Sequence, residues 1–569
     1  MLKRRDKAGV VIGRSLCMGS LLLAGLAHAD AEPVAASTEP AAADAGPAAA
    51  APLKPTVKVV SGSSADAIMI TQLLDTAISK LDGAPRTLDE VNRWSDALTL
   101  ALRQGGFPIG QVLMTEDDWQ ATRKGAQAQF TAFPGRISRI TLKNTSRVKD
   151  ARLTRLIHHA MCGSDSVGGA CLLRTSRLER TTQLLQDVPG VALDGAPQIS
   201  PGAGTGDVDV TFNIVQLGKM AKADLLVDNN GIESTGQYRF GVTASANNVF
   251  GQGEDYALTV MDTNKNMWTG SVSASMPIFD DGLRMTAGYT RQQYSINAGT
   301  PLTGVSNVIQ TGIAYPFARG LDRNVWGSVS YVHNQSSTDF TDFGGSSQSN
   351  KLNAVQLSLR ADNGDRARQL RSDIWSAQTA LTVGHQSNNS FANSDAHISG
   401  DYAKLTGSGF GTYGLSKSGN LFMSARINSQ ISNRNLDPSE KLSIGGANAV
   451  RAYRNDEGSV DEGMVFNLGL YQRVPVATGH QLQFGVFTDV AWGRVNHSPW
   501  DGWQNTYPAG VDVKNIRTLA GYGAGVDWLT PFGAVVSASV AKPYGFSSAS
   551  WIDPGSKKPQ VWLSVTWGH

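Results

Sequence analysis

The 569-residue chain predicts two small α+β units followed by an all-β barrel that crosses a membrane. Three observations support this fold class. Helical spacing of apolar residues is confined to the part of the chain before residue 220. Beyond it, apolar residues alternate with Ser, Thr, Gly, Asn and Arg, a polar face suited to an aqueous lumen. Trp and Tyr recur near the ends of these alternating segments, as they do at the interfaces of a membrane barrel.

Composition narrows the classes of function. The formal net charge is only +2, so no nucleic-acid partner is predicted. The chain has 61 Gly, 12 Trp and three Cys, which suits a β-rich protein with many turns. It contains no G-x-S-x-G, Walker or H-E-x-x-H motif, so we predict neither an enzyme nor a bound cofactor.

Residues 1–29 have the pattern of a secretory signal peptide. A basic start precedes an apolar stretch over residues 16–26, and Ala27-His28-Ala29 offers a small-residue cleavage site. Residues 30–55, rich in Ala and Pro, are expected to form a linker, and their prolines oppose a helix that could plug a pore. No later run is long and apolar enough for a membrane-spanning helix, so a closed barrel is the expected membrane structure.

Residues 56–135 form the first predicted α+β unit. Its expected elements are a strand, two helices and two strands, over residues 56–60, 65–81, 88–105, 107–114 and 127–133. Gly105-Gly106 is expected to end the second helix.

Residues 136–217 form a second unit of similar size. Its expected elements are a strand, two helices and a final strand, over residues 137–144, 150–160, 175–186 and 207–215. Cys162 and Cys171 lie close together in the sequence, and outside the cytoplasm such a pair predicts a local disulfide, with two free buried thiols as the alternative. His158 and His159 lack a complete ligand set, so no metal site is predicted.

Residues 218–569 are predicted to be the barrel. Tyr238, Phe240 and Val242 share one face of a strand, and the polar or small residues between them share the other. A soluble sheet would alternate in the same way, but no amphipathic helix remains to cover it.

A Gly-rich loop in this region contains the candidate functional residues. Val450, Arg451 and Tyr453 follow Gly445 and Gly446, two glycines expected to support the loop. The strand-like run 484–492 carries one carboxylate, Asp489. We predict that Arg451 pairs with Asp489, because a guanidinium binds a carboxylate with two parallel hydrogen bonds. A solvated Arg451 is the alternative, and isolated acids such as Asp342 and Asp461 are expected to be solvated loop residues.

These motifs resemble the ShlB/FhaC/HecB family of outer-membrane transporters of two-partner secretion. The family's V-R-G-[YF] loop motif reads Val450-Arg451-Ala452-Tyr453, and its F-x-D strand motif reads Phe487-Thr488-Asp489. Ala452 stands where the motif has Gly, a residue that adopts a left-handed backbone easily. Gly106-Phe107-Pro108 and Val188-Pro189-Gly190-Val191 resemble landmarks of the family's POTRA domains.

The resemblance implies two POTRA domains in the periplasm and a barrel of 16 antiparallel strands in a Gram-negative outer membrane. It implies that the POTRA domains recognise an unfolded, secreted exoprotein of the TpsA type by strand addition at their sheet edges and grooves. The barrel would then secrete this exoprotein. Outer-membrane lipid is the other expected partner, and the barrel is expected to be monomeric. A barrel assembly factor like BamA or TamA is the alternative, although such proteins typically carry more POTRA units.

Overall fold

The computed structural model describes residues 54–60, 62–296, 301–340, 346–364, 373–389, 397–506, 513–545, 547–548, 550–551 and 558–568. The predicted signal peptide, most of the predicted linker, and Asp342 lie outside the described residues.

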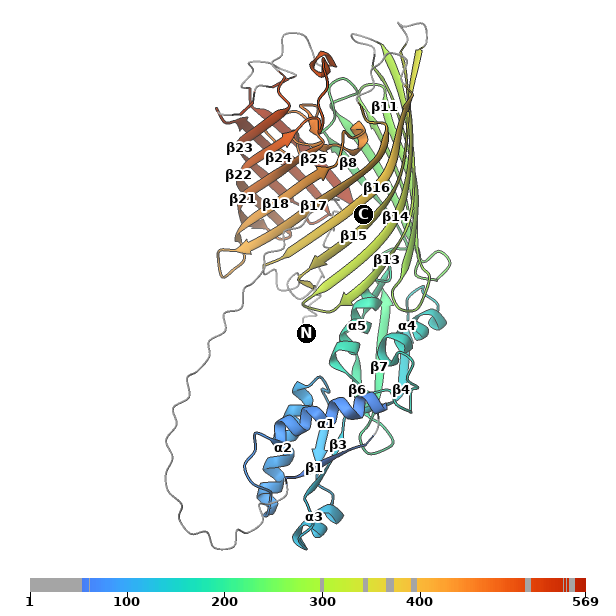
Figure 1. The fold of residues 1–569 in the computed structure, drawn as a ribbon, viewed down its shortest axis with the longest axis vertical. Coiled ribbons are helices and arrows are strands. Elements are labelled where there is room, and N and C mark those ends of the chain that lie inside the picture. The colour runs from blue at the N-terminus through green and yellow to red at the C-terminus, as the bar shows by residue number, and fades with distance from the viewer. Residues whose placement is uncertain are drawn as a thin grey trace.

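The first small domain is a three-stranded sheet covered by two helices (Figure 1). Its elements are β1 Thr56–Val59, α1 Ser64–Ile78, α2 Leu88–Gln104, β2 Gln111–Leu113, α3 Glu116–Arg123 and β3 Gln129–Phe133. β3 lies between β1 and β2, parallel to β1 and antiparallel to β2. Apolar residues of α1 and α2, such as Leu74 and Leu98, are completely buried against this sheet.

Two features of this domain differ from the sequence-based expectation. β2 is three residues long because residues 107–110 form a turn, in which the Gly110 amide donates to the Phe107 carbonyl. α3 was not predicted. Thr115 caps its N-terminus by accepting from the Asp118 amide at 3.2 Å, and three acidic residues occupy its first turn, where they interact favourably with the helix dipole.

The second small domain has the predicted first strand, two helices and last strand, together with two short strands that were not predicted. Its elements are β4 Arg136–Asn144, α4 Asp150–Cys162, α5 Thr175–Gln186, β5 Val191–Leu193, β6 Gln198–Pro201 and β7 Asp207–Gln216. β7 pairs with β4 on one side and with β5 and β6 on the other. Its core is separate from that of the first domain and contains both cysteines.

The remaining strands form a closed antiparallel barrel of sixteen strands, as predicted. They are β8 Ala221–Asp228, β9 Arg239–Asn247, β10 Asp255–Thr263, β11 Met267–Pro277, β12 Arg284–Ile296, β13 Leu302–Arg319, β14 Asn324–Phe340, β15 Ser346–Asp362, β16 Trp375–Asn389, β17 Gly400–Gly414, β18 Leu421–Ser432, β21 Glu462–Ala477, β22 His480–Arg494, β23 Ile516–Leu529, β24 Ala534–Pro543 and β25 Gln560–Gly568. Each strand pairs with its sequence neighbour in the barrel, and β25 closes the ring on β8. Closure leaves the wall without a free edge.

The outer face of the barrel is apolar. Representative apolar side chains on this face, each 43–58% exposed, are those of Leu258, Ile313, Val355 and Val486. A wall of such residues is stable only against lipid, because a continuous apolar surface of this size is unfavourable in water. Among the helices that the structure describes, none has the length and apolar character to span a bilayer.

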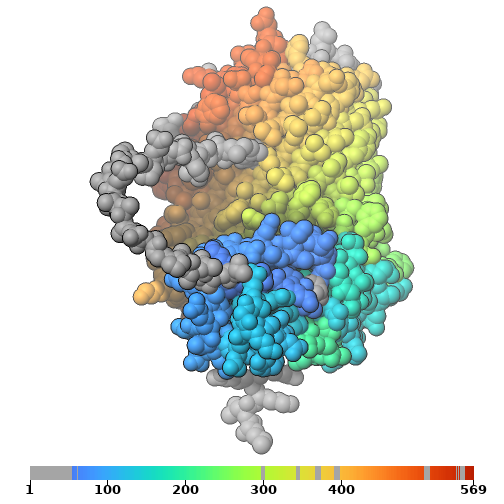
Figure 2. Space-filling model, turned by 60° about the horizontal axis from the view of Figure 1, so that its bottom comes forward, coloured from blue at the N-terminus to red at the C-terminus, as the bar shows by residue number. Residues whose placement is uncertain are grey.

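Both small domains lie at one end of the barrel, and Figure 2 shows them side by side beneath it. Three arginines join the second domain to the barrel's turns. Arg319 pairs with Asp187 through two bonds of 2.7 Å, Arg180 donates to the Pro316 carbonyl at 2.9 Å, and Arg152 pairs with Asp280. The second domain is therefore held against the barrel's turns between β11 and β14.

Candidate functional site

Residues 433–461, here called the inward loop, connect β18 to β21 and fold into the barrel. The loop contains a 3-10 helix, Pro438–Glu440, and a short hairpin of β19 Leu442–Ser443 and β20 Ser459–Val460. Most of its buried apolar residues form a cluster with inward-facing residues of β21–β24, such as Val465 and Leu519, while Leu436 packs against residues of β15 and β17. The loop therefore contacts the lumen wall both before β18 and after β21.

The structure brings Arg451 and Asp489 together. The Arg451 side chain donates to the two Asp489 carboxylate oxygens at 2.9 Å and 2.7 Å, and its backbone amide donates at 3.1 Å. Asp489 is completely buried and Arg451 has 18% of its side chain exposed. This geometry is the two-pronged contact that a guanidinium makes with a carboxylate, with the loop backbone as a third donor.

Two neighbours complete this contact. The Phe487 ring centroid lies 3.2 Å from the Arg451 guanidinium carbon, so the motif's aromatic residue stacks on the cation. Asn467, opposite Asp489 on β21, donates to Asp489 and to the Ala449 carbonyl, both at 2.8 Å. The sequence motifs do not identify Asn467 as part of this site. Its position on the polar face of a strand next to the Asp489 strand is the signal that could have identified it.

Gly445 and Gly446 let the two arms of the inward loop approach each other. Gly446 has φ of +107°, which favours glycine. A side chain at either glycine would collide with the opposite arm, at Asn455 for Gly446 and at the Arg454 carbonyl for Gly445. The glycines therefore set the close spacing that presents Val450 and Arg451.

Ala452 does not adopt a left-handed backbone, because only Asn248 and His397 have positive φ among the described non-glycine residues. Room for its methyl group comes from Gly521 on β23, where an added Cβ would lie 2.3 Å from that of Ala452. Val450 is fully buried in the apolar cluster, and the Tyr453 hydroxyl donates to the Ser548 carbonyl at 3.3 Å. The departure from the family's Gly is thus accommodated by a glycine on the wall.

A second ion pair holds the base of the loop. Glu457 and Arg517 on β23 pair at 2.8 Å, and each side chain is only 1% exposed. Glu457 also accepts from the Ser550 hydroxyl and the Trp551 amide, both at 2.7 Å, while the Trp551 ring lies 3.7 Å from the Arg517 guanidinium.

The expectation that Asp461 is a solvated loop acid is wrong. Asp461 is completely buried and pairs with Lys441 at 3.0 Å. Its two oxygens also accept from the backbone amides of Leu436 and His497 at 3.1 Å and 2.8 Å. A buried carboxylate without these donors would be energetically unfavourable. The contacts of Asp461 therefore hold the first and last parts of the inward loop together.

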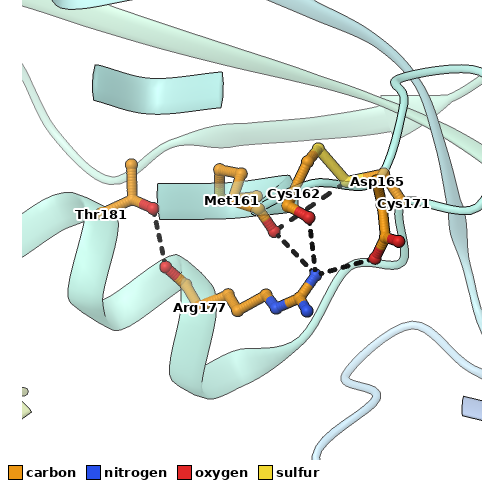
Figure 3. Close-up of a disulfide and its surroundings, with 6 residues drawn as sticks. All are labelled: Met161, Cys162, Asp165, Cys171, Arg177 and Thr181. Atoms are coloured by element: carbon orange, nitrogen blue, oxygen red, sulfur yellow. Dashed lines mark hydrogen bonds and ion pairs between the residues drawn. A yellow bond between two sulfur atoms is a disulfide. The ribbon is translucent and has the colours of Figure 1, made fainter. Parts of the chain in front are cut away.

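In the second small domain, Cys162 and Cys171 are joined by a disulfide (Figure 3). Cys162 is the last residue of α4, and Arg177 on α5 donates to the carbonyl of that residue at 3.4 Å. Leu172, next to Cys171, is buried in the core of the first domain, and Arg174 pairs with Asp66 on α1. The disulfide therefore fixes residues 171–174, which contact the first domain, to the end of α4 in the second domain.

The first domain has a groove between the N-terminal half of α2, the end of β2, and α3. Leu88, Leu113 and Trp119 supply apolar surface to it, and Asp96 and Glu116 supply negative charge. Leu88 is 58% exposed and Leu113 45% exposed.

Beside this groove, the outer edge of β2 is already occupied by side chains of α2. Thr99 accepts from the Val112 amide at 2.9 Å and donates to its carbonyl at 3.4 Å, and Arg103 donates to the Gly110 carbonyl at 3.0 Å. Strand addition at this edge would have to displace Thr99.

The second domain contains an ion pair between Arg136 and Asp207, outside the barrel. Arg136 binds Asp207 through two bonds of 2.7 Å and 2.9 Å. The hydrogen bonds from Arg136 hold the pKa of the Asp207 carboxyl below its ordinary value.

Comparisons with known proteins agree with this architecture. The model of the family described as "Haemolysin secretion/activation protein ShlB/FhaC/HecB" matches residues 205–527. The heme/hemopexin transporter protein HuxB of Haemophilus influenzae strain 86-028NP is 23% identical over 505 residues, covering 87% of this chain and 84% of HuxB.

Two solved structures show a similar fold. CdiB from Escherichia coli superposes with a TM-score of 0.70 at 17% identity, over 92% of each chain. CdiB from Acinetobacter baumannii gives 0.66 at 15% identity, over 91% of this chain and 90% of its own. Because the family match spans more than half of the sequence, the chain belongs to the ShlB/FhaC/HecB family, and it is an outer-membrane translocator of two-partner secretion with POTRA domains in the periplasm.

Proposed function

We propose that this translocator receives its exoprotein in the groove of the first POTRA domain and passes it through the barrel lumen, past the inward loop. Family members work with secreted exoproteins of the TpsA type. The observation that supports the docking site is the groove's exposed apolar floor, formed by Leu88, Leu113 and Trp119. An unfolded polypeptide offers apolar side chains that such a floor can cover.

The charge of the groove indicates which kind of exoprotein segment would bind there. Asp96 and Glu116 line it, so a segment with a basic residue among apolar ones is the complementary ligand. Because Thr99 already occupies the backbone groups of Val112, recognition here rests on side chains rather than on strand addition at β2. The strand-addition mechanism expected from the family resemblance is therefore not proposed for this edge.

In the barrel, the proposed role of the Arg451–Asp489 pair is positional. The pair joins the loop tip to β22 and keeps the tip against the β21–β24 wall, so that the loop stays in one position while the polypeptide passes. A buried ion pair of this kind specifies position more than it adds stability. We propose that the barrel acts as a monomer, with its apolar outer face in contact with lipid.

A pair of leucine variants tests the docking site. Leu88 and Leu100 lie on the same helix with nearly equal exposure, 58% and 57%, but only Leu88 lines the groove. Covering a half-exposed leucine contributes about 1 kcal/mol, so Leu88→Ser should weaken exoprotein binding roughly fivefold. Leu100→Ser serves as the matched control.

The measurement is binding of the exoprotein's N-terminal region to the full-length transporter, together with secretion into the medium. Equal binding by both variants would contradict the proposed docking site. The abundance of other outer-membrane barrels is followed in parallel, because their loss on deletion of this chain, with secretion intact, would indicate an assembly factor instead.

A further inference from the structure

The barrel closes where its last strand meets its first, and this seam is the shortest strand pairing in the wall. β25 pairs with β8 over five residues, from Asp228 with Ser564 to Asp224 with Gly568. Among the described barrel strands, every other neighbouring pair has eight or more paired residues, and the shortest of those have eight. Since each paired residue contributes backbone hydrogen bonds, the seam is the weakest junction of the barrel.

An asparagine side chain extends the seam beyond the end of β8. The Asn229 side-chain amide donates to the Val561 carbonyl at 2.8 Å, and its oxygen accepts from the Leu563 amide at 2.7 Å. The Asn229 backbone amide donates to the Leu563 carbonyl at 3.2 Å. The side chain thus supplies one donor and one acceptor, as a further strand residue would.

The inward loop contacts both flanks of this seam from the lumen side. On the β25 flank, the Trp562 indole donates to the Arg451 carbonyl at 2.7 Å. On the β8 flank, Asn455 donates to the Asn230 carbonyl and Arg454 pairs with Glu233. Residues 451–455 therefore bridge the last strand and the loop that follows the first strand, next to the Arg451–Asp489 pair.

We propose that the inward loop staples the closing seam of the barrel, so that release of Arg451 from Asp489 also loosens the pairing of β8 with β25. The staple bonds exist only while the loop is docked, so they favour the closed seam. By reciprocity, a closed seam favours the docked loop. When the loop leaves, the wall can widen at its weakest junction. Trp562 and Arg454 are positioning residues in this device, which rests on the proposed role of the loop.

Two tryptophans on β25 provide a matched test. Trp562→Phe removes the indole donor to the loop but keeps an aromatic ring, whereas Trp567→Phe removes a donor to the Phe532 carbonyl on the outside of the barrel. Backbone hydrogen exchange is measured by mass spectrometry on the full-length protein in lipid nanodiscs. Trp562→Phe should raise exchange in β8 and β25 about three- to tenfold, as the loss of one hydrogen bond implies, with β13 and β14 unchanged.

Seam exchange that stays at the wild-type level in Trp562→Phe would overturn the proposal. Arg454→Gln acts on the other flank and provides a second variant if Trp562→Phe does not fold, which is checked by the heat-dependent gel mobility of the barrel. Arg451→Ala must also raise seam exchange. If Arg451→Ala blocks secretion while seam exchange stays at the wild-type level, the staple is refuted and the loop's positional role stands.

Discussion

Replacing Asp489 by Ala removes the acceptor that holds the loop tip to the wall. The carboxylate accepts three hydrogen bonds from Arg451 and one from Asn467. In the variant, the Arg451 guanidinium keeps its contact with the Phe487 ring but loses its counter-charge.

The expected magnitude follows from burial. Removing one partner of a buried ion pair costs about 3–5 kcal/mol because the other charge stays uncompensated. Arg451 retains 18% exposure and borders a cavity lined by Arg426 and Tyr471, where water can solvate it, so the lower limit of about 3 kcal/mol applies. This free energy shifts the ratio of docked to released loop roughly a hundredfold toward release.

The assay combines secretion of the exoprotein with labelling of a cysteine placed in the inward loop by a membrane-impermeant thiol reagent. Asp489→Ala should reduce secretion and increase labelling, with the barrel still folded. The control is Asp527→Ala, which removes a lumen-facing carboxylate that contacts Gln483 and not the loop. Wild-type secretion and labelling in Asp489→Ala would refute the positional role of the pair.

Exchanging the two charges, with Arg451→Asp and Asp489→Arg together, should restore secretion only partly. The backbone amide of residue 451 and the Asn467 side chain both donate to the carboxylate at position 489. An arginine there cannot accept these bonds. Full restoration would show that opposite charge alone positions the loop.

Three further variants probe the periplasmic region. Replacing Cys162 and Cys171 by Ser should lower the free energy of unfolding of the POTRA pair by about 2–3 kcal/mol in chemical denaturation, and a reductant should reproduce this in the wild type but not in the variant. Arg319→Ala should loosen the contact of the second POTRA domain with the barrel, seen as a broader distribution of distances between spin labels on the two, whereas an unchanged distribution would show that other contacts suffice. Asp207→Asn should lower the unfolding midpoint at neutral pH. Because Arg136 lowers the folded-state pKa of Asp207, this difference should persist above the ordinary carboxyl pKa of 3.8 and disappear as the pH falls below it; a difference that persists in strong acid would contradict the ion pair as its cause.

Local sequence patterns predicted most of the elements because each depends on residues close together in the chain. The alternation around Phe240 and Val242 predicted a strand because successive side chains in a strand point to opposite faces. The spacing of Val91, Trp94 and Leu98 predicted α2 within one residue of its C-terminus. The sequence could also have predicted α3, because Thr115 and the acidic residues that follow it form a local helix-start pattern.

The candidate site was predicted only where two motifs identified its residues. Arg451 and Asp489 were paired from their motifs, but Asn467 and Asp461 were not assigned to the site. Their partners come from strands and loops that meet only after the barrel has closed, and no periodicity along the chain encodes such a meeting.

The sequence by itself thus determined which segments are helix or strand, which faces are apolar, and that these strands need lipid outside and water inside, because these properties follow from the order of residues along each segment. The tertiary structure alone decided which buried charges meet, that Thr99 covers the edge of β2, and that Trp562 links the inward loop to the seam. These contacts join residues far apart in the chain, so their distances are set by how the strands close into a ring rather than by any local preference.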